Sequence, residues 1–420
     1  MSIEKFKSKR TLIFVAALIA TFCAGFGYSW SIIQSALMTT HPDWTASAIA
    51  ITYTLQVSIS CLGPIPLSPI ITRLNVKQNI MVGGILYGVG LIGCFFFGSS
   101  LPMLYLFYGG FAGAGVAFIY PQMMSYSVKV LADKGSLASG LMAAAYGSGA
   151  VIWAPVAQGM IGNDGSGLPH TFLVLGLVFL IVIVCMSLFL SDIPEGYVES
   201  LSSKDEKKSS APAKKTAPDK TRGEMVKTAT CWIMLICFSL ALTSGMLAIS
   251  QAKGIVADTA GGAIAAHAAL AVSIITLFNT LGRLFWGTVS TKTGIYNVNI
   301  ILCIIGAVCM GVLAFLPSGI GVVIFLALTA SCFGGFATLL TPMTADFFGY
   351  KNLTVNFGFM YIAFAVAALI GPRLATSMVT KIGGVTSYSK AYIAGAILSL
   401  VAAALAVVLK GTYKKIQSKA

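Results

Sequence analysis

The sequence predicts an all-α membrane protein whose twelve transmembrane helices form two bundles of six. Three observations support this fold class: 57% of the 420 residues are hydrophobic, only 10% are charged, and apolar segments recur along the chain. A soluble domain has about a quarter of its residues charged, so this chain cannot keep its surface in water. The 44 glycines agree, because small residues let helices approach closely within lipid.

The first predicted bundle covers residues 1–190. Its basic start, Lys5 to Arg10, resembles a signal peptide, but the apolar run that follows is too long and has no small-residue cleavage site. We therefore assign that run as the first span, since about 20 apolar residues cross the hydrocarbon. The six spans are predicted at Thr11–Gln34, Ser47–Thr72, Asn79–Phe97, Leu101–Val128, Ser136–Gly162 and Thr171–Leu190.

A charged segment, residues 191–227, separates the two bundles and is predicted to be a solvated linker because it is poor in apolar residues. The second bundle is predicted to cover residues 228–420. Its spans are predicted at Thr228–Ala252, Ala265–Ser290, Asn297–Leu316, Gly321–Phe348, Leu353–Met378 and Tyr388–Leu409.

The distribution of lysine and arginine predicts the orientation. When successive loops are assigned to alternate sides, 22 of the 27 basic residues fall on the side that holds both termini and the linker, and only Lys253, Lys381 and Lys390 fall opposite. We expect a multi-pass protein of the inner membrane with both termini cytoplasmic. The net charge of +14 does not indicate nucleic acid, because the basic residues flank the spans.

Chemistry-bearing clusters are missing from the sequence. The nine cysteines fall singly within apolar stretches, without metal-ligand spacing, and no buried acid or cysteine–histidine pair suggests catalysis. We expect no enzyme activity, no metal and no cofactor. Twelve spans alone are compatible with a transporter or a channel, and a carboxylate sensor stays open, although a sensor should carry an output domain.

Arg283 is the most informative residue. It precedes Lys292 by nine residues, which places it roughly 13 Å inside the membrane from that cytoplasmic anchor, and its own span has no acidic residue. Ionisable residues at such depth usually serve function. A guanidinium stays charged and can hold a carboxylate through two hydrogen bonds, so we predict an anion site. The alternatives are that Arg283 reaches the headgroups or pairs with a loop acid.

Depth along the predicted helices suggests neighbours for Arg283. Asn279 precedes it by four residues on the same helix face, and Tyr120 lies at the same level in the fourth span. Three aromatic residues at that depth are candidates for an apolar wall, although plain packing is the commoner role of such residues: Phe336, Tyr361 and Phe364. Arg373 lies near a span end and His267 far from Arg283, so both are predicted to be structural or loop residues.

Several motifs resemble the oxalate/formate antiporters and the related monocarboxylate transporters of the major facilitator superfamily. The resemblance covers nearly the whole chain. Its motifs are Gly27-Tyr28-Ser29-Trp30, the stretch GAGVAFIY at 113–120, Asp133-Lys134 with LASGLMAAAYGSG at 137–149, Pro194-Glu195-Gly196-Tyr197, Thr228 with Trp232, and the segment from Arg283 to Ser290 and Lys292.

The resemblance implies a major facilitator fold and adds Tyr28 to the substrate-binding candidates. Oxalate antiporters carry a lysine where this chain has Phe364, and monocarboxylate transporters carry an aspartate where it has Asn279. One cation in place of two favours one carboxylate over two. Thr72 and Thr291 replace the aspartate that is usual in the superfamily's loop motif.

The expected function is therefore proton-coupled transport of a small monocarboxylate by alternating access, with L-lactate first and pyruvate or formate also possible. The alternatives are carboxylate exchange of the oxalate/formate type and a sensor that binds carboxylate without moving it. The expected partners are the carboxylate, protons and membrane lipid.

Overall fold

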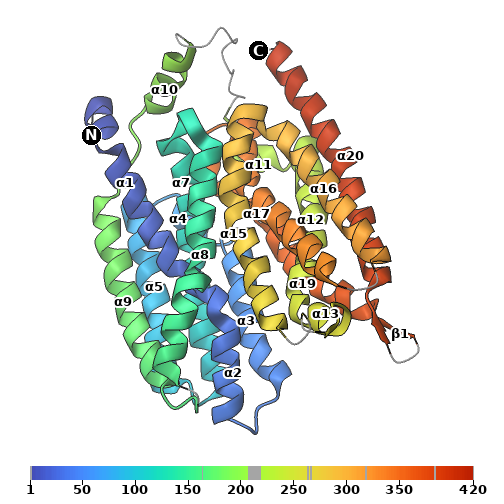
Figure 1. Ribbon diagram of the computed structural model, residues 1–420. Coiled ribbons are helices and arrows are strands. Elements are labelled where there is room, and N and C mark those ends of the chain that lie inside the picture. The colour runs from blue at the N-terminus through green and yellow to red at the C-terminus, as the bar shows by residue number, and fades with distance from the viewer. Residues whose placement is uncertain are drawn as a thin grey trace. The chain divides into compact units, whose positions relative to one another are not determined.

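The computed structural model describes residues 2–419 apart from residues 163, 207–218, 263, 265, 266, 317, 318, 383 and 384. The described chain is almost entirely helical (Figure 1). Its first elements are α1 (Ile3–Ala24), the 3-10 segment η1 (Gly25–Ser29), α2 (Trp30–Thr40), α3 (Ala46–Leu62), α4 (Ser68–Ile71), α5 (Val76–Phe97), α6 (Leu101–Leu104), the π-helical segment η2 (Tyr105–Ala112), α7 (Gly113–Val130), η3 (Ala132–Lys134), α8 (Gly135–Ile161), α9 (Leu168–Phe189) and α10 (Tyr197–Glu206).

The second half continues the helical pattern and adds one small hairpin. Its described elements are α11 (Arg222–Met225), α12 (Ala229–Ser250), α13 (Ala252–Thr259), α15 (Ala268–Thr293), α16 (Ile295–Phe315), α17 (Ile320–Phe348), α18 (Leu353–Met360), α19 (Ile362–Ser377), β1 (Thr380–Ile382), β2 (Val385–Ser387) and α20 (Ser389–Lys419). The two strands pair antiparallel, with Thr380 opposite Ser387.

The predicted spans correspond to helices of the structure. Among the described residues, eleven helices are long and apolar enough to cross a membrane, and the helix of the second span, Ser47–Leu62, is apolar but shorter. That span was predicted to run on to Thr72, but its helix ends at Leu62 because Pro64 and Pro66 follow directly. The all-α membrane fold is confirmed, and α13 and the β1–β2 hairpin are additions to it.

The chain divides into two compact units. The first comprises Met1–Asp133, Ala145–Ala213 and Phe357–Phe359, and the second comprises Lys134–Ala144, Lys214–Asn356 and Met360–Ala420. Most of α8 therefore belongs to the first unit, but its opening turns belong to the second. The division into bundles at residues 1–190 and 228–420 remains a prediction.

In the first unit, α5 packs against α9 and α7, and α1 packs against α9 and α7 (Figure 1). Helix α10, which lies within the predicted linker, is attached to this unit by Tyr197. The ring of Tyr197 is fully buried against Phe6, with centroids 4.7 Å apart, and its hydroxyl donates to the carbonyl oxygen of Val130 at 2.8 Å. Burial also raises the pKa of the Tyr197 phenol.

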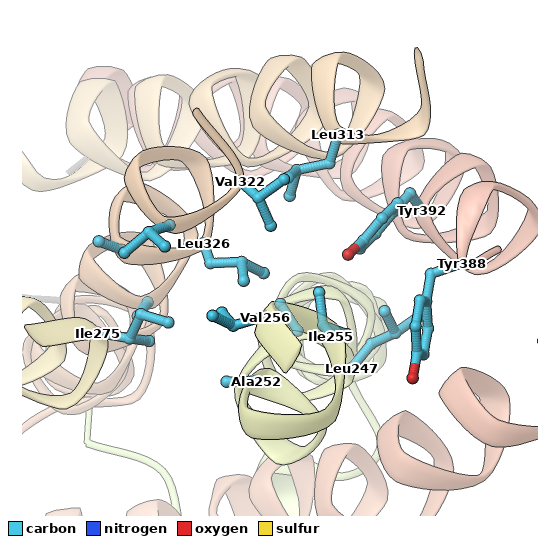
Figure 2. Packing of buried hydrophobic residues seen from close by; sticks show 14 of the residues in the cluster. Leu247, Ala252, Ile255, Val256, Ile275, Leu313, Val322, Leu326, Tyr388 and Tyr392 are labelled. Atoms are coloured by element: carbon cyan, nitrogen blue, oxygen red, sulfur yellow. The ribbon is translucent and has the colours of Figure 1, made fainter. Parts of the chain in front are cut away.

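In the second unit, α15 packs against α17, α16 against α20, and α12 against α19 and α20. The short helix α13 directs Ile255 and Val256 into an apolar cluster with Leu326 of α17 (Figure 2). At the edge of this cluster the Tyr388 hydroxyl donates to Asp258 at 2.9 Å.

The described end of the predicted linker is bound to the turn between α17 and α18. The carboxylate of Asp219 accepts from the backbone N–H of Lys351 at 2.9 Å. The backbone N–H of Lys220 donates to the carbonyl oxygen of Phe348 at 3.0 Å, and the side-chain amides of Asn352 and Asn356 donate to the carbonyl oxygen of Lys220 at 3.1 and 3.0 Å. Residues 219 and 220 are thus fixed within the second unit.

Candidate functional site

Arg283 lies on α15 and is almost completely buried, with 3% of its surface exposed. It is therefore not extended to the surface of the unit, as an arginine that reaches lipid headgroups would be. Burying a charged group without partners is costly, so the atoms around the guanidinium decide what this residue can do.

Two oxygen atoms accept hydrogen bonds from the guanidinium. Nε donates to Oδ1 of Asn279, one helical turn earlier on α15, at 3.3 Å, and Nη1 donates to the carbonyl oxygen of Ala143 on α8. Among the described residues the ion pair found joins Arg10 to Asp133 at 3.4 Å, and Arg283 has no carboxylate partner there. Dipoles stabilise the cation in this part of the chain, and its net charge is left uncompensated.

The backbone of Arg283 is held as firmly as its side chain. The hydroxyl of Thr338 on α17 donates to the carbonyl oxygen of Arg283 at 3.1 Å, and the hydroxyl of Ser139 on α8 donates to the carbonyl oxygen of Thr338 at 2.7 Å. Thr338, Ser139 and Ala143 all belong to the second unit. Hydrogen bonds therefore join α8, α15 and α17 around a single arginine.

Two glycines permit this close approach. A Cβ atom at Gly140 would lie 2.7 Å from the carbonyl oxygen of Arg283, and a Cβ atom at Gly334 would lie 2.2 Å from the carbonyl oxygen of Asn279. Real Cβ atoms do not come so near to backbone atoms, so a larger residue at either position would separate the helices. The glycine in LASGLMAAAYGSG at position 140 thus has a packing role beside the arginine.

The aromatic candidates of the second unit form two pairs. Tyr361 stands between α18 and α19 with its ring centroid 5.0 Å from that of Phe364, which also contacts Phe333 at 6.0 Å. Phe336 is buried on α17 and contacts Phe238 of α12 at 6.2 Å. These contacts are between rings, and an apolar wall at the arginine site, like the part of these rings in binding, stays a prediction.

The first unit brings its two candidates together on a third ring. Tyr28 contacts Tyr146 with centroids 5.2 Å apart, and Tyr120 contacts the same ring at 4.4 Å. Tyr120 is buried, whereas Tyr28 is 40% exposed. A Cβ atom at Gly25 would lie 2.1 Å from the carbonyl oxygen of Tyr146, so the first span passes directly against α8 beside this cluster.

Sequence reasoning missed the groups that position Arg283. Ala143 contributes only a backbone oxygen, which no residue type reveals, and Ser139 and Thr338 are small polar residues of a kind common in spans. Tyr146 was detectable, because it lies in the most specific of the quoted motifs. Its ring is the shared contact of both tyrosine candidates.

The remaining polar candidates lie elsewhere. Arg373 is exposed on α19 and His267 is exposed at the start of α15. The structural role of Arg373 and the loop role of His267 stay predictions. Eight of the nine cysteines are buried, and Cys185 is exposed. No group of three metal-ligating side chains occurs among the residues described.

Comparisons with known proteins show the relatives and the fold of this chain. The sequence profile of the Major Facilitator Superfamily matches residues 17–338. The chain is 29% identical over 401 residues to the oxalate:formate antiporter of Oxalobacter formigenes, covering 93% of this chain and 89% of the relative. It is 28% identical over 378 residues to the MFS-type transporter YhjX of Escherichia coli, covering 88% of each.

A more distant relative is monocarboxylate transporter 12 of Rattus norvegicus, 26% identical over 345 residues, which cover 77% of this chain and 70% of that protein. Among solved structures, the fucose:proton symporter FucP of E. coli matches with a TM-score of 0.71 at 15% identity over 96% of this chain and 99% of that one. The proton:xylose symporter XylE matches with a TM-score of 0.69 at 13% identity, over 94% and 95%. The family resemblance predicted from the motifs and the predicted fold are confirmed.

Proposed function

The chain belongs to the Major Facilitator Superfamily, and on that premise we propose that it exchanges small carboxylates across the membrane. Membership makes it a multi-pass membrane transporter and not an enzyme. The observation that carries the choice of substrate is Arg283, a buried cation whose described side-chain partners are one carbonyl oxygen and one amide oxygen.

The chemistry of the guanidinium favours a carboxylate. An arginine at membrane depth costs on the order of 2.5–3.5 kcal/mol on insertion scales, and an anion from solution offsets that cost by supplying the missing charge. Nη2 has no hydrogen bond to the described residues, and Nη1 is bound to a neutral carbonyl that a charged oxygen can displace. Two parallel hydrogen bonds to one carboxylate are the geometry that arginine provides.

Charge balance also favours exchange. A site that holds one cation is neutral when a monocarboxylate is bound and charged when it is empty, so the loaded form changes conformation at lower electrostatic cost. An empty carrier that reorients slowly gives exchange in place of net flow. The relative that aligns over 93% of this chain is named an oxalate:formate antiporter, which supports this choice.

Proton-coupled symport of L-lactate is the second candidate. It is supported by Phe364, an apolar ring where oxalate antiporters carry a lysine, and by the similarity to monocarboxylate transporter 12. A single cation suits a single carboxylate. A proton would then travel with the substrate as the neutral acid, because Asn279, beside Arg283, cannot titrate.

We extend the proposal to the other candidates and to the orientation. Asn279 would donate its amide N–H to the substrate, and Tyr28, Tyr120, Phe336, Tyr361 and Phe364 would shape the surroundings. Both termini would face the cytoplasm from the inner membrane, as the lysine and arginine distribution favours.

Reconstituted proteoliposomes test the proposal. Vesicles loaded with formate, oxalate or L-lactate should take up the labelled form of the same acid, and unloaded vesicles should take up little. Uptake into unloaded vesicles that follows an imposed pH gradient would instead favour symport. If none of these acids moves under either condition, carboxylate transport is refuted.

A further inference from the structure

The opening turns of α8 contact α15 and α17 through hydrogen bonds and close backbone approach, and this contact is called the lock. Residues Lys134–Ala144 belong to the second unit, whereas the rest of the same helix belongs to the first. Transporters of this family alternate access by moving their halves against each other. Helix α8 is continuous from Gly135 to Ile161, and the proline inside it is Pro155. If α8 moves as one helix, the contact between its opening turns and α15 opens.

Two hydrogen bonds and a close backbone contact hold the opening turns of α8. Nη1 of Arg283 donates to the carbonyl oxygen of Ala143, and Ser139 donates to the carbonyl oxygen of Thr338 at 2.7 Å. Gly140 and Gly287 let the two backbones touch: a Cβ atom on Gly287 would lie 3.1 Å from the carbonyl oxygen of Ser136 and 3.3 Å from Cα of Gly140.

The hydrogen bond from Arg283 is the one that a substrate can replace. A carboxylate is a stronger acceptor for a guanidinium than a neutral carbonyl is. The carbonyl of Ala143 sits within α8, where it keeps its helical hydrogen bond when the arginine leaves, so release orphans no buried group. Replacing the Ala143 carbonyl by a carboxylate therefore strengthens the hydrogen bond of Arg283 and leaves no buried carbonyl without a hydrogen bond.

We propose that the carbonyl oxygen of Ala143 accepts the guanidinium hydrogen bond that a substrate would otherwise accept. A bound carboxylate then frees the opening turns of α8 from α15. The proposal rests on carboxylate binding at Arg283. It assigns Ser139, Gly140 and Gly287 as positioning residues that set how firmly the empty site stays closed. Substrate binding and conformational release would then be one event at one arginine.

Thiol accessibility at position 136 reports the lock. Ser136 is 8% exposed and its carbonyl oxygen lies against Gly287, and a Ser136→Cys variant leaves Arg283, Ser139 and Gly140 in place. Its labelling by N-ethylmaleimide is followed peptide by peptide by mass spectrometry, with buried Cys61 and Cys332 as references. Saturating formate, oxalate or L-lactate should raise the labelling rate about tenfold, and should fail to do so when Arg283→Ala is added.

Binding of the same three acids is measured on the same Ser136→Cys protein by titration calorimetry. If an acid binds and labelling at position 136 does not change, the lock is refuted while the carboxylate site stands. If no acid binds, the proposed function and the lock are both refuted. If the acids still raise the labelling rate when Arg283→Ala is present, the role of the arginine is refuted.

A pair of glycine variants tests the contact without ligand. Gly140→Ala places a methyl group 2.7 Å from a backbone oxygen, whereas Gly159→Ala, on the same helix, meets nothing within 4 Å. In the Ser136→Cys background, Gly140→Ala should label rapidly without any acid, and Gly159→Ala should label like the parent. Ser139→Ala is the milder variant should Gly140→Ala not fold. Slow labelling in every folded variant would overturn the proposal.

Discussion

The surroundings of Arg283 in the second unit depend on a single charge, whereas those of Tyr146 in the first unit depend on several ring contacts. Around Arg283 a single charge is held by one amide, one carbonyl and close backbone contacts. Around Tyr146 the contacts are between neutral rings, 4.4 and 5.2 Å apart. A charge in low dielectric dominates its site, whereas ring contacts share a smaller energy. A single substitution should therefore remove most carboxylate binding and transport when it is made at Arg283, and should weaken transport only slightly when it is made at Tyr146.

The largest expected effect is the loss of the charge itself. Arg283→Ala should reduce carboxylate binding and exchange by about 100-fold, because hydrogen bonds to charged groups contribute about 1.5–3 kcal/mol. Calorimetry and vesicle uptake measure this loss. Arg373→Ala is the matched control, since that arginine is exposed and should be dispensable. Equal activity in the two variants would contradict the site.

A smaller effect should follow when the charge is kept but given a partner. Asn279→Asp places a carboxylate where the amide oxygen now lies 3.3 Å from Nε of Arg283. This internal anion should compete with the substrate and weaken formate binding about tenfold at pH 7. Asn279→Leu removes the amide without adding charge and should lose less. Formate binding as tight in the aspartate variant as in wild type would show that the charge balance is unimportant.

A second cation should change the preference of the site. Phe364→Lys adds a positive charge to a half-buried position that contacts Tyr361 and Phe333. We expect the ratio of oxalate to formate affinity to rise about tenfold, since a dicarboxylate then meets two cations. Competition for labelled formate measures the ratio. Phe364→Met keeps an apolar side chain and should leave it unchanged, and a similar ratio in both variants would exclude position 364 from the site.

The smallest effects are expected in the first unit. Tyr146→Phe keeps the ring contacts to Tyr28 and Tyr120, so transport should fall by no more than about twofold. Tyr146→Ala removes both contacts and should lower the melting temperature, since truncating a buried aromatic residue costs about 3–5 kcal/mol. Thermal unfolding in detergent and vesicle uptake separate stability from transport. A loss of transport in Tyr146→Phe as large as that in Arg283→Ala would contradict the difference between the two regions.

Much of the fold was predictable because lipid demands long apolar helices. Every predicted span has its helix. The second helix ends early, where Pro64 and Pro66 follow α3, the first passes through η1, and the eleventh is divided at Tyr361 into α18 and α19. Short elements outside the spans were not predictable from hydropathy. Helix α13 is held by Ile255 and Val256 in a tertiary cluster, and α10 is held by the buried ring of Tyr197 within a segment whose composition resembles a linker.

The candidate site was predictable only where side chains carry the chemistry. Helix periodicity paired Asn279 with Arg283, and a hydrogen bond joins them. The second partner of Arg283 is a backbone oxygen of Ala143, and the close approach at Gly140 depends on two helices distant in sequence. Residue types and spacing do not reveal such contacts, so the sequence identifies the charged residue but not the backbone groups that bind it.

The attachment of Asp219 and Lys220 to the turn after α17 affects how the molecule can be assembled. Those hydrogen bonds, to Phe348, Lys351, Asn352 and Asn356, join parts of one unit. A separate polypeptide that begins at Lys214 would carry its own anchor and need no covalent tether to hold that end in place. Co-expression of the two fragments should therefore restore a working transporter from a severed chain.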